Sequence, residues 1–311
     1  MPIRSVTVRV PAKVNLQLSV GPREEDGFHN LVSVFQAISI FDEVTLSLGQ
    51  PKSGVSISIT GEQTHGVPAD ANNLAAQAAA LMAEEYDIEI DAHIEIKKSI
   101  PVAGGMAGGS ADAAATIVAI DYLYSLGMSR EEMADIAAKL GSDVPFMLNG
   151  GTAIGTGHGD QLTSALSRGT YHWVLALSTH GLSTPAVYAE CDRLRTGLEI
   201  VEPQTNEALM QALLAADAES VGAHLSDAAA SGGAIEEATL DGGSTLGPSS
   251  PAPAHAPTIV LTTESPLSSP CSCAEVSSTR LRPTATPPSS LPPRPYPPWR
   301  RPLPAPPSRP A

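Results

Sequence analysis

The chain has 311 residues, a formal net charge of −15 and a mean hydropathy of +0.01. This charge argues against a protein that binds nucleic acid or an acidic membrane, because such partners require a basic surface. No run of about 18 apolar residues is present and the N-terminus lacks the layout of a secretory signal, so we expect no membrane partner and a cytoplasmic protein. Cys191, Cys271 and Cys273 are too few and too scattered for a disulfide or zinc framework, which also fits a reducing compartment.

Two different kinds of sequence meet near residues 225–235. Residues 1–225 contain 27 acidic and 12 basic residues, whereas residues 226–311 contain six of each. Nineteen of the 28 prolines lie between Pro248 and Pro310. The acidic charge therefore belongs to the first part of the chain, and most of the proline belongs to the second.

Hydrophobic patterns in the first part alternate between those of strands and those of helices. Strands are predicted where apolar residues recur with a period of two, and helices where alanine-rich stretches follow polar residues. A helix should begin after Ser129, since Glu132 follows at the spacing of a capping box. Strands clustered early and helices later predict an α+β fold. The expected strands are residues 6–10, 14–20, 42–48, 55–60, 92–97 and 171–178, and the expected helices are residues 73–84, 109–126, 129–140, 183–194 and one or two within 206–223.

A glycine-rich turn, PVAGGMAGGSADAAA, occupies residues 101–115 between a predicted strand and a predicted helix. Its glycines allow a ligand to approach the backbone closely, and free N–H groups in the first helical turn, at the positive end of the helix dipole, would form a phosphate cradle. The spacing matches neither G-x-x-x-x-G-K-[ST] nor G-x-G-x-x-G. From the residues alone, two interpretations remain: a phosphate-binding loop, or a flexible connection before a tightly packed helix.

Four segments in the same order resemble motifs of the GHMP kinase superfamily, which includes galactokinase, homoserine kinase and mevalonate kinase. IEIKKSIPVAGGMAGGSADAAA at 94–115 looks like the phosphate-binding motif of the superfamily. The other three are similar to one branch of it, whose substrate is a cytidine diphosphate-linked methylerythritol. They are PAKVNLQLSV at 11–20 followed by EEDGFHNL at 25–32, LGSDVPFMLNGGTAIGTGHGD at 140–160, and HGLSTPAVYAECD at 180–192.

The resemblance covers roughly residues 5 to 225 and implies a two-domain GHMP kinase-like α+β fold. The N-terminal domain of that fold is similar to domain 2 of ribosomal protein S5. We expect an ATP-binding N-terminal domain at residues 1–160 and a partial C-terminal domain at residues 161–230. Residues 231–311 lie outside the resemblance.

The resemblance also implies an activity, which is the ATP-dependent phosphorylation of the tertiary 2-hydroxyl of the cytidine diphosphate-linked substrate in the non-mevalonate isoprenoid pathway. The residues by themselves indicate only phosphoryl transfer to a hydroxyl by ATP and magnesium. Another GHMP kinase, acting on homoserine or mevalonate, is the second possibility. The sequence Asp26-Gly27-Phe28-His29 and Tyr188 favour the first, because a substrate without a base has no use for an aromatic pair.

Lys13 and Asp143 match the catalytic pair of the family. Asp143 would accept the proton of the substrate hydroxyl, and Lys13 would lie near that hydroxyl and the γ-phosphate and favour the anionic transition state. Without the surrounding motifs, the same residues would be interpreted as a helix-capping aspartate and a solvated strand lysine.

The nucleotide is expected on residues 101–111, with Lys98 near it and Asn73 and Leu74 at the adenine. Ser110 is a candidate for the Mg²⁺ shell, since magnesium prefers hard oxygen ligands and keeps several waters. No cluster of His, Cys and carboxylate residues suggests a metal site made by the protein alone, so magnesium should arrive with ATP. The expected nucleotide contacts are Asn73, Leu74, Lys98, Pro101, Val102, Ala103, Gly104, Gly105, Met106, Ala107, Gly108, Gly109, Ser110 and Ala111.

The cytidine base needs flat surfaces and hydrogen-bond partners. Phe28 and Tyr188 match positions at which the family offers aromatic rings, and stacking of a base on such a ring contributes about 1–3 kcal/mol. His29 matches a cytosine-contacting histidine, and Asn15 matches a substrate-contacting asparagine. Ordinary core packing is the alternative for both rings, but the Asp-Gly turn before Phe28 favours an exposed ring at the rim of a pocket.

The resemblance stops where the family carries a third glycine-rich motif, S-G-S-G-P-T, because this chain has no such run. From Ser226 onward the sequence becomes rich in Pro, Ser and Arg and cannot bury enough apolar surface to offset its ordering entropy. We therefore expect a C-terminal domain that is truncated or replaced by a disordered tail over residues 231–311.

Two origins for this tail stay open. Codons can be chosen for residues 249–254 whose shifted reading frame encodes Ile-Val-Ser-Gly-Ser-Gly, so the tail can derive from a frame change in a GC-rich gene. Alternatively, PPRPYPP and PLPAPP resemble polyproline ligands of SH3-like or WW-like modules. Loss of the third motif also raises the possibility of a catalytically dead ATP-binding protein.

Overall fold

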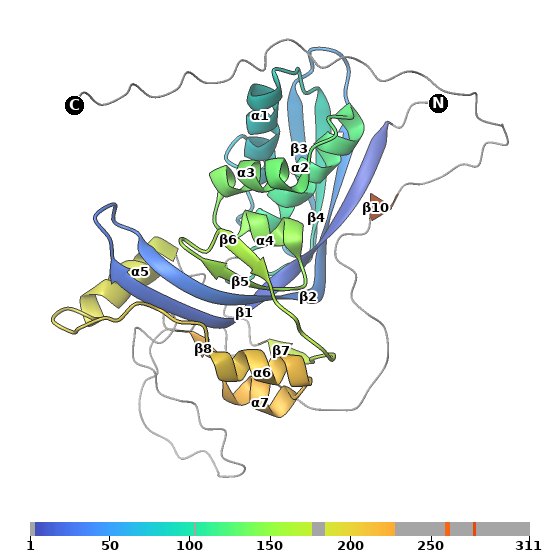
Figure 1. Cartoon of the computed structure of the whole chain (residues 1–311). Coiled ribbons are helices and arrows are strands. Elements are labelled where there is room, and N and C mark those ends of the chain that lie inside the picture. Colours follow the sequence, from blue (N-terminus) through green and yellow to red (C-terminus); the bar gives the residue numbers. More distant parts are fainter. Residues whose placement is uncertain (1–3, 103, 176–183, 228–258, 262–275, 278–311) are drawn as a thin grey trace, which may run out of the picture. The chain divides into compact units, whose positions relative to one another are not determined.

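The computed structural model describes residues 4–102, 104–175, 184–227, 259–261 and 276–277 (Figure 1). Contacts divide the chain into one unit at Met1–Ser278 and another at Thr279–Ala311, and all of the described residues belong to the first. Almost all of the predicted disordered tail therefore lies outside the described residues. The predicted domain boundary near residue 160 stays a prediction.

A long antiparallel hairpin forms the centre of the sheet. Its strands are β1 (Ser5–Arg23) and β2 (His29–Leu48), whose register shifts between Pro11 and Ala12, among other places. Proline has no N–H to donate to the ladder, which explains why the alternation breaks there and why the sequence predicts two strands where one runs through. In β2, residues 32–36 are buried on both faces, which removes the alternation by which strands are recognised.

The remaining strands extend this hairpin on both sides. The strand order is β10-β1-β2-β4-β3, with β3 parallel to β4 and β4 antiparallel to β2. β5 pairs with the first half of β2, β6 pairs with β5, and β8 pairs with β1, while β7 and β9 form a separate two-stranded sheet. Their bounds are β3 Val55–Gly61, β4 Ala92–Lys98, β5 Thr152–Thr156, β6 Gln161–Ser164, β7 Trp173–Leu175, β8 Ser226–Asp227, β9 Ile259–Leu261 and β10 Val276–Ser277.

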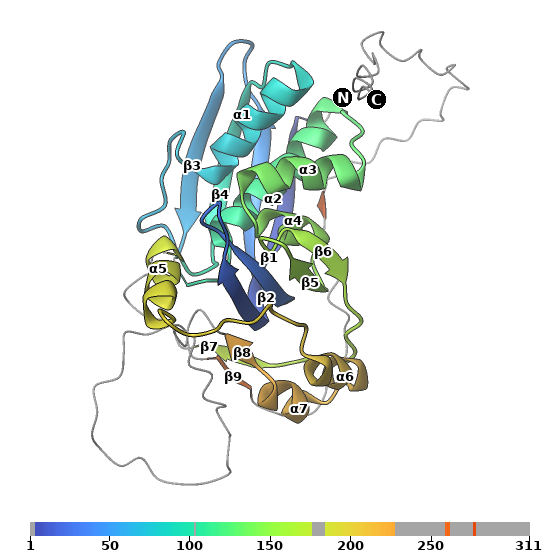
Figure 2. The same cartoon turned by 60° about the vertical axis from the view of Figure 1, so that its left-hand side comes forward.

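Four helices pack together on one face of this sheet (Figures 1 and 2). The side chains of β4 alternate strictly between buried and exposed, which is the pattern of a strand covered on one face only. The capping box predicted at Ser129 and Glu132 is present at the start of α3. These helices are α1 Leu74–Tyr86, α2 Gly108–Tyr124, α3 Arg130–Leu140 and α4 Val144–Asn149.

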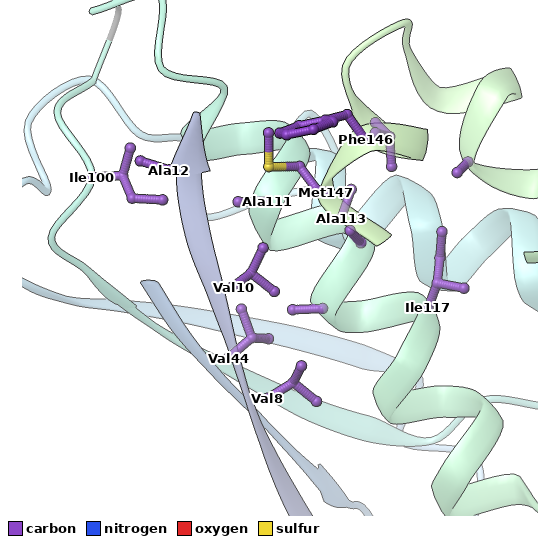
Figure 3. Close-up of a cluster of buried hydrophobic side chains, with 14 of the residues drawn as sticks. Val8, Val10, Ala12, Val44, Ile100, Ala111, Ala113, Ile117, Phe146 and Met147 are labelled. Carbon is purple, nitrogen blue, oxygen red and sulfur yellow. The ribbon is translucent and has the colours of Figure 1, made fainter. Parts of the chain in front are cut away.

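Helix α2 lies at the centre of the core. Ala113 and Ile117 of this helix pack near Val8 and Val44 of the sheet, and all four are fully buried (Figure 3). Alanine side chains let the helix lie close to the strands, and a helix apolar on nearly all sides is typical of burial within a core. Helix α2 is thereby packed against β1 and β2.

Three helices follow β7 in the chain. They are α5 (Thr184–Leu194), α6 (Glu207–Ala215) and α7 (Ala218–Ala223). The side chain of Gln17 on β1 donates to the carbonyl of Gln204 at 2.8 Å and accepts from the backbone N–H of Asn206 at 2.9 Å. The start of α6 is thus hydrogen-bonded to the central hairpin.

The α+β class and the long helices are confirmed, whereas several short elements differ from the expectation. β5, β6 and α4 are not predicted by the sequence patterns, because they are only five, four and six residues long. Of the strand expected at residues 171–178, Trp173–Leu175 is observed, and residues 176–178 lie outside the described part. β9 and β10 fall inside the segment predicted to be disordered, and the β-branched run around Ile259 explains the first of them.

Among the described residues, no helix is both long and apolar enough to cross a membrane.

Candidate active site

Lys13 and Asp143 face each other across the site. Lys13 Nζ lies 3.6 Å from Asp143 Oδ2, and Lys13 is only 6% exposed, so it is not a solvated strand lysine. Asp143 occupies the N-cap position of α4, yet its side chain makes no capping hydrogen bond. Its half-exposed carboxylate faces the lysine instead, so neither of the structural alternatives raised by the sequence describes this pair.

The ammonium group of Lys13 is held by its own strand. Nζ donates to Asn15 Oδ1 at 2.5 Å, and the amide of Asn15 in turn donates to Ser33 Oγ at 2.7 Å. The Phe35 ring centroid lies 5.5 Å from Nζ, within range of a cation–π contact. This lysine follows directly after the register shift at Pro11, and a shift of this kind re-aims the side chains beyond it.

The glycine-rich loop joins β4 to α2 beside this pair. Its Met106 carbonyl accepts a hydrogen bond from the backbone N–H of Lys13 at 3.3 Å. The N-cap of α2 is Ala107, in the left-handed region at φ 58°, and it offers no side-chain capping bond. The first N–H groups of α2 therefore have no side-chain cap and are suited to an anionic ligand. Ala103 lies outside the described residues.

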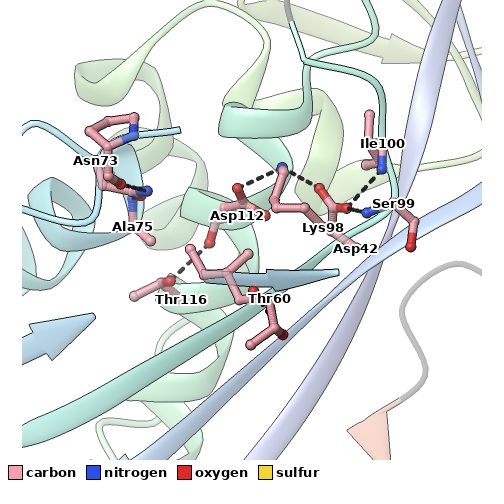
Figure 4. A network of polar contacts seen from close by, with 11 residues as sticks. Asp42, Thr60, Asn73, Ala75, Lys98, Ser99, Ile100, Asp112 and Thr116 are labelled. Atoms are coloured by element: carbon pink, nitrogen blue, oxygen red, sulfur yellow. Dashed lines mark hydrogen bonds and ion pairs between the residues drawn. The ribbon is translucent and has the colours of Figure 1, made fainter. Parts of the chain in front are cut away.

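Lys98 lies buried beneath the loop, with 2% of its surface exposed. Its Nζ pairs with Asp42 and, at 2.8 Å, with Asp112, both of which are buried as well (Figure 4). Burial raises the pKa of the Asp112 carboxyl to about 7, the nearby Lys98 opposes this rise, and Asp42 adds to it. The structure thus places Lys98 inside the protein, paired with two buried carboxylates, and its contact with a nucleotide stays a prediction.

The residues expected at the adenine lie at the start of α1. Asn73 caps this helix, accepting from Ala75 N at 2.9 Å and donating to the Pro68 carbonyl at 2.8 Å, so its side chain is occupied locally. Leu74 is half-buried, and its Cδ1 lies 3.4 Å from where a Cβ on Gly109 would be. These two residues therefore border the helical end of the glycine-rich loop.

Ser110, the candidate for the magnesium shell, lies half-buried in the first turn of α2. No group of three or more His, Cys, Asp or Glu residues that could hold a metal ion occurs within the described ranges.

Phe28 lies at the exposed tip of the hairpin. The turn that carries it is closed by a hydrogen bond from Phe28 N to Asp26 Oδ1 at 2.9 Å and by Gly27 at φ 86°. The ring is 60% exposed and stacks on the imidazole of His158 with centroids 5.0 Å apart. The expectation of an exposed ring at an Asp-Gly turn is confirmed, and core packing is excluded for this residue.

His29 links the hairpin to α5. Its ring stacks on Tyr188 with centroids 5.5 Å apart, and its Nε2 lies 2.8 Å from Asp192 Oδ1. The other oxygen of Asp192 lies 3.8 Å from Arg23 Nε. The structure therefore brings Phe28, His29 and Tyr188 to one region, although their segments lie far apart in the sequence.

Several charged residues of the site escaped the sequence reasoning. They are Asp42, Asp112, Asp192, Arg23 and His158. Asp112 gave one usable signal, since a carboxylate within an otherwise alanine-rich helix requires a partner. The other four carry no local pattern, because their partners are distant in the chain.

Comparison with known proteins gives matches over most of this part of the chain. The GHMP kinases N terminal domain model matches residues 73–151. The 4-diphosphocytidyl-2-C-methyl-D-erythritol kinase of Streptomyces coelicolor is 52% identical over 214 residues, which cover 69% of this chain and 71% of that protein. The corresponding kinase of Thermobifida fusca is 52% identical over 231 residues, covering 72% and 74%.

Solved structures show the same likeness. A crystal structure of a 4-(cytidine 5′-diphospho)-2C-methyl-D-erythritol kinase superposes with a TM-score of 0.52 at 31% identity, covering 67% of this chain and 70% of that one. The mevalonate kinase of L. major, at 15% identity and a TM-score of 0.56 over 75% of this chain and 76% of that one, shares the fold.

Proposed function

Since the chain belongs to the 4-diphosphocytidyl-2-C-methyl-D-erythritol kinases of the GHMP kinase family, we propose that it transfers the γ-phosphoryl group of ATP to the 2-hydroxyl of that diphosphocytidyl substrate. The observation that carries the assignment of roles is the Lys13–Asp143 pair beside the glycine-rich loop. A buried cation, a carboxylate that makes no capping hydrogen bond and a helix N-terminus without a side-chain cap meet there.

Asp143 acts as the general base in this proposal. Its carboxylate is half-exposed and free of capping bonds, so it can accept the proton of the 2-hydroxyl as the oxygen attacks. Lys13, held by Asn15, stabilises the developing alkoxide and the charge on the transferred group. Its burial strengthens this interaction, since a charge screened from water acts over a lower effective dielectric.

The loop at residues 101–111 would hold the phosphates of ATP. The uncapped first turn of α2 and the left-handed Ala107 support this, because they leave backbone N–H groups directed at the loop. Bound ATP supplies the phosphoryl group, and the magnesium that accompanies it offsets the phosphate charge, with Ser110 as the candidate ligand. Leu74 and Asn73 would border the adenine.

The aromatic rim would hold the cytidine. The exposed ring of Phe28 and the half-buried ring of Tyr188 offer stacking faces, and His29 offers a hydrogen-bond partner for the base. The substrate diphosphate would then lie between this rim and Lys13.

A coupled assay with ATP, magnesium and 4-diphosphocytidyl-2-C-methyl-D-erythritol tests the proposal. We expect the full chain to phosphorylate this substrate, and to act on neither homoserine nor mevalonate, which lack the base. Phosphorylation of homoserine or mevalonate in preference would overturn the assignment.

A second candidate is an ATP-binding protein with little catalysis, favoured by the absence of an S-G-S-G-P-T run from the chain. Loss of that segment would leave the site open to water and weaken the transition-state electrostatics. In this case we expect low stability and strongly reduced turnover despite Lys13 and Asp143.

A version of the gene with its frame corrected near codons 220–260 separates the two candidates. Equal rates for both versions would contradict a damaged C-terminal region, and no turnover by the corrected version would contradict the kinase proposal.

A further inference from the structure

Three buried ionisable side chains lie in a row beneath the glycine-rich loop. Lys98 Nζ donates to Asp42 and to Asp112, and the exposed fractions of these residues are 2%, 0% and 1% (Figure 4). One oxygen of Asp112, Oδ1, has no hydrogen-bond partner among the described residues. Burying a cluster of ionisable side chains costs free energy, and replacing such a cluster with apolar side chains often leaves stability unchanged or increases it. Stability alone therefore does not explain why these three side chains are buried together.

The row connects the two ends of the loop. Asp42 Oδ1 accepts from the backbone N–H groups of Ser99 at 2.6 Å and Ile100 at 2.9 Å, which lead into the loop from β4. Asp112 belongs to the first turns of α2, where the loop ends. Lys98 lies between the two carboxylates and joins them.

The loop also rests directly on this lysine. A Cβ built on Gly108 would lie 3.1 Å from Lys98 Nζ and 3.2 Å from Ile100 Cγ2, which is tighter than ordinary contact. The backbone of the first α2 residue therefore approaches the buried ammonium group as closely as glycine allows.

We propose that Asp42 and Asp112 are positioning residues for ATP: through Lys98 they hold both ends of the glycine-rich loop, so that its backbone N–H groups stay aimed at the phosphates. This inference rests on the proposed function of that loop. In this proposal neither carboxylate contacts the nucleotide, because both are buried and because a carboxylate repels the negatively charged phosphates of ATP.

The direction in which the affinity for ATP changes in the aspartate variants separates a positioning role from a purely electrostatic one. Neutralising a carboxylate beneath a phosphate site removes a repulsion, so electrostatics alone predicts tighter ATP binding in Asp42→Asn and Asp112→Asn. Positioning predicts weaker binding, because the loop loses one of its two supports. Loss of an orienting partner at metal sites costs about 10–100-fold, and we expect about tenfold here.

The experiment is calorimetric titration of the full chain and its variants with a non-hydrolysable ATP analogue plus magnesium, and separately with the diphosphocytidyl substrate. We expect both aspartate variants to bind the analogue about tenfold more weakly and the substrate as the unmodified chain does. Thr116→Val is the matched control: it removes a buried hydrogen bond to the Asp112 carbonyl, at 2.8 Å, without touching the row of charges. It should lose stability and keep its affinity for the analogue.

Gly108→Ala covers the case in which an aspartate variant does not fold. Its methyl group would push the loop away from Lys98 with no change of charge, and we expect the same selective loss of affinity for the analogue. Unchanged or tighter binding in the folded variants overturns the positioning role, as does an equal loss in Thr116→Val. If the unmodified chain binds the substrate but no ATP analogue, the proposed function itself fails.

Discussion

The two ends of the candidate site are built in opposite ways. At the phosphate end, Lys13, Lys98 and Asp112 are at most 6% exposed and lie between the sheet and the helices that cover it. At the base end, Phe28 is 60% exposed, and the contacts run between the hairpin and α5. The phosphate end positions charge by burial within one packed core, whereas the base end depends on pairing between distant segments. Substitutions at the phosphate end should alter catalysis and stability, and substitutions at the base end should alter the affinity for the substrate.

Replacing either residue of the Lys13–Asp143 pair is the strongest test of the claim that the phosphate end carries the chemistry. Lys13→Met and Asp143→Asn should each lower kcat by about 10²–10⁴-fold, the usual contribution of a positioned acid or base, while binding of an ATP analogue stays within about twofold. Steady-state kinetics and calorimetry measure the two quantities. Lys97→Met is the control, because this lysine lies on the exposed face of β4 and, among the described residues, forms an ion pair with Glu43 at 3.3 Å. A kcat for Asp143→Asn within tenfold of the unmodified chain would exclude it as the base.

The buried phosphate end should also make the free energy of unfolding depend on pH. The folded-state pKa of Asp112, about 7, lies above the value of 3.8 for an unfolded chain, so the folded protein binds the extra proton. The stability that this proton provides is fully present below about pH 4 and is lost as the pH rises through about 7. At 1.36 kcal/mol per unit, the loss is at most about 4 kcal/mol.

Denaturant unfolding between pH 4 and pH 8 measures that loss. The free energy of unfolding of Asp112→Asn should fall less with pH than that of the unmodified chain. The curve for Thr116→Val, which removes no titratable group, should run parallel to the unmodified one. If the curves of Asp112→Asn and the unmodified chain ran parallel, the Asp112 carboxyl of the unmodified chain would be ionised throughout this pH range.

The base end should respond in affinity alone. Tyr188→Ala and Phe28→Ala should each raise the KM for the diphosphocytidyl substrate about 5–150-fold, which corresponds to the 1–3 kcal/mol of one base stack, and leave the KM for ATP unchanged. Tyr122→Ala, an exposed tyrosine of α2, should change neither KM. A joint rise in both KM values would mean that the rim and the loop are one unit, contrary to the comparison.

The sequence predicts the features of this molecule that depend on neighbouring residues better than those that depend on contacts between distant segments. Local patterns were sufficient for α1, α2 and the α3 capping box, because helix signals lie within a few residues of each other. They failed in the first half of β2, where burial on both faces removes the alternation, although the strand predicted at residues 42–48 is confirmed as its second half. The motifs also indicated Lys13, Asp143 and Lys98, whereas the pairing of Lys98 with Asp42 and that of His29 with Asp192 could not be predicted. Those contacts join residues 56 and 163 positions apart, and no local pattern encodes such pairings.

The smallest expected effect concerns Asp192, which contributes one hydrogen bond to the base end of the site. Its Oδ1 lies 2.8 Å from His29 Nε2 and ties α5 to the hairpin. Asp192→Ala should raise the KM for the diphosphocytidyl substrate about 2–12-fold, the value of one net hydrogen bond, with kcat and the KM for ATP unchanged. Glu190→Gln on the same helix is the matched control, since within the described part of the chain its carboxylate is bonded to the exposed Arg193. If Asp192→Ala lowered kcat instead, the base end would take part in aligning the reacting hydroxyl, and the division between a chemical end and a recognition end would not hold.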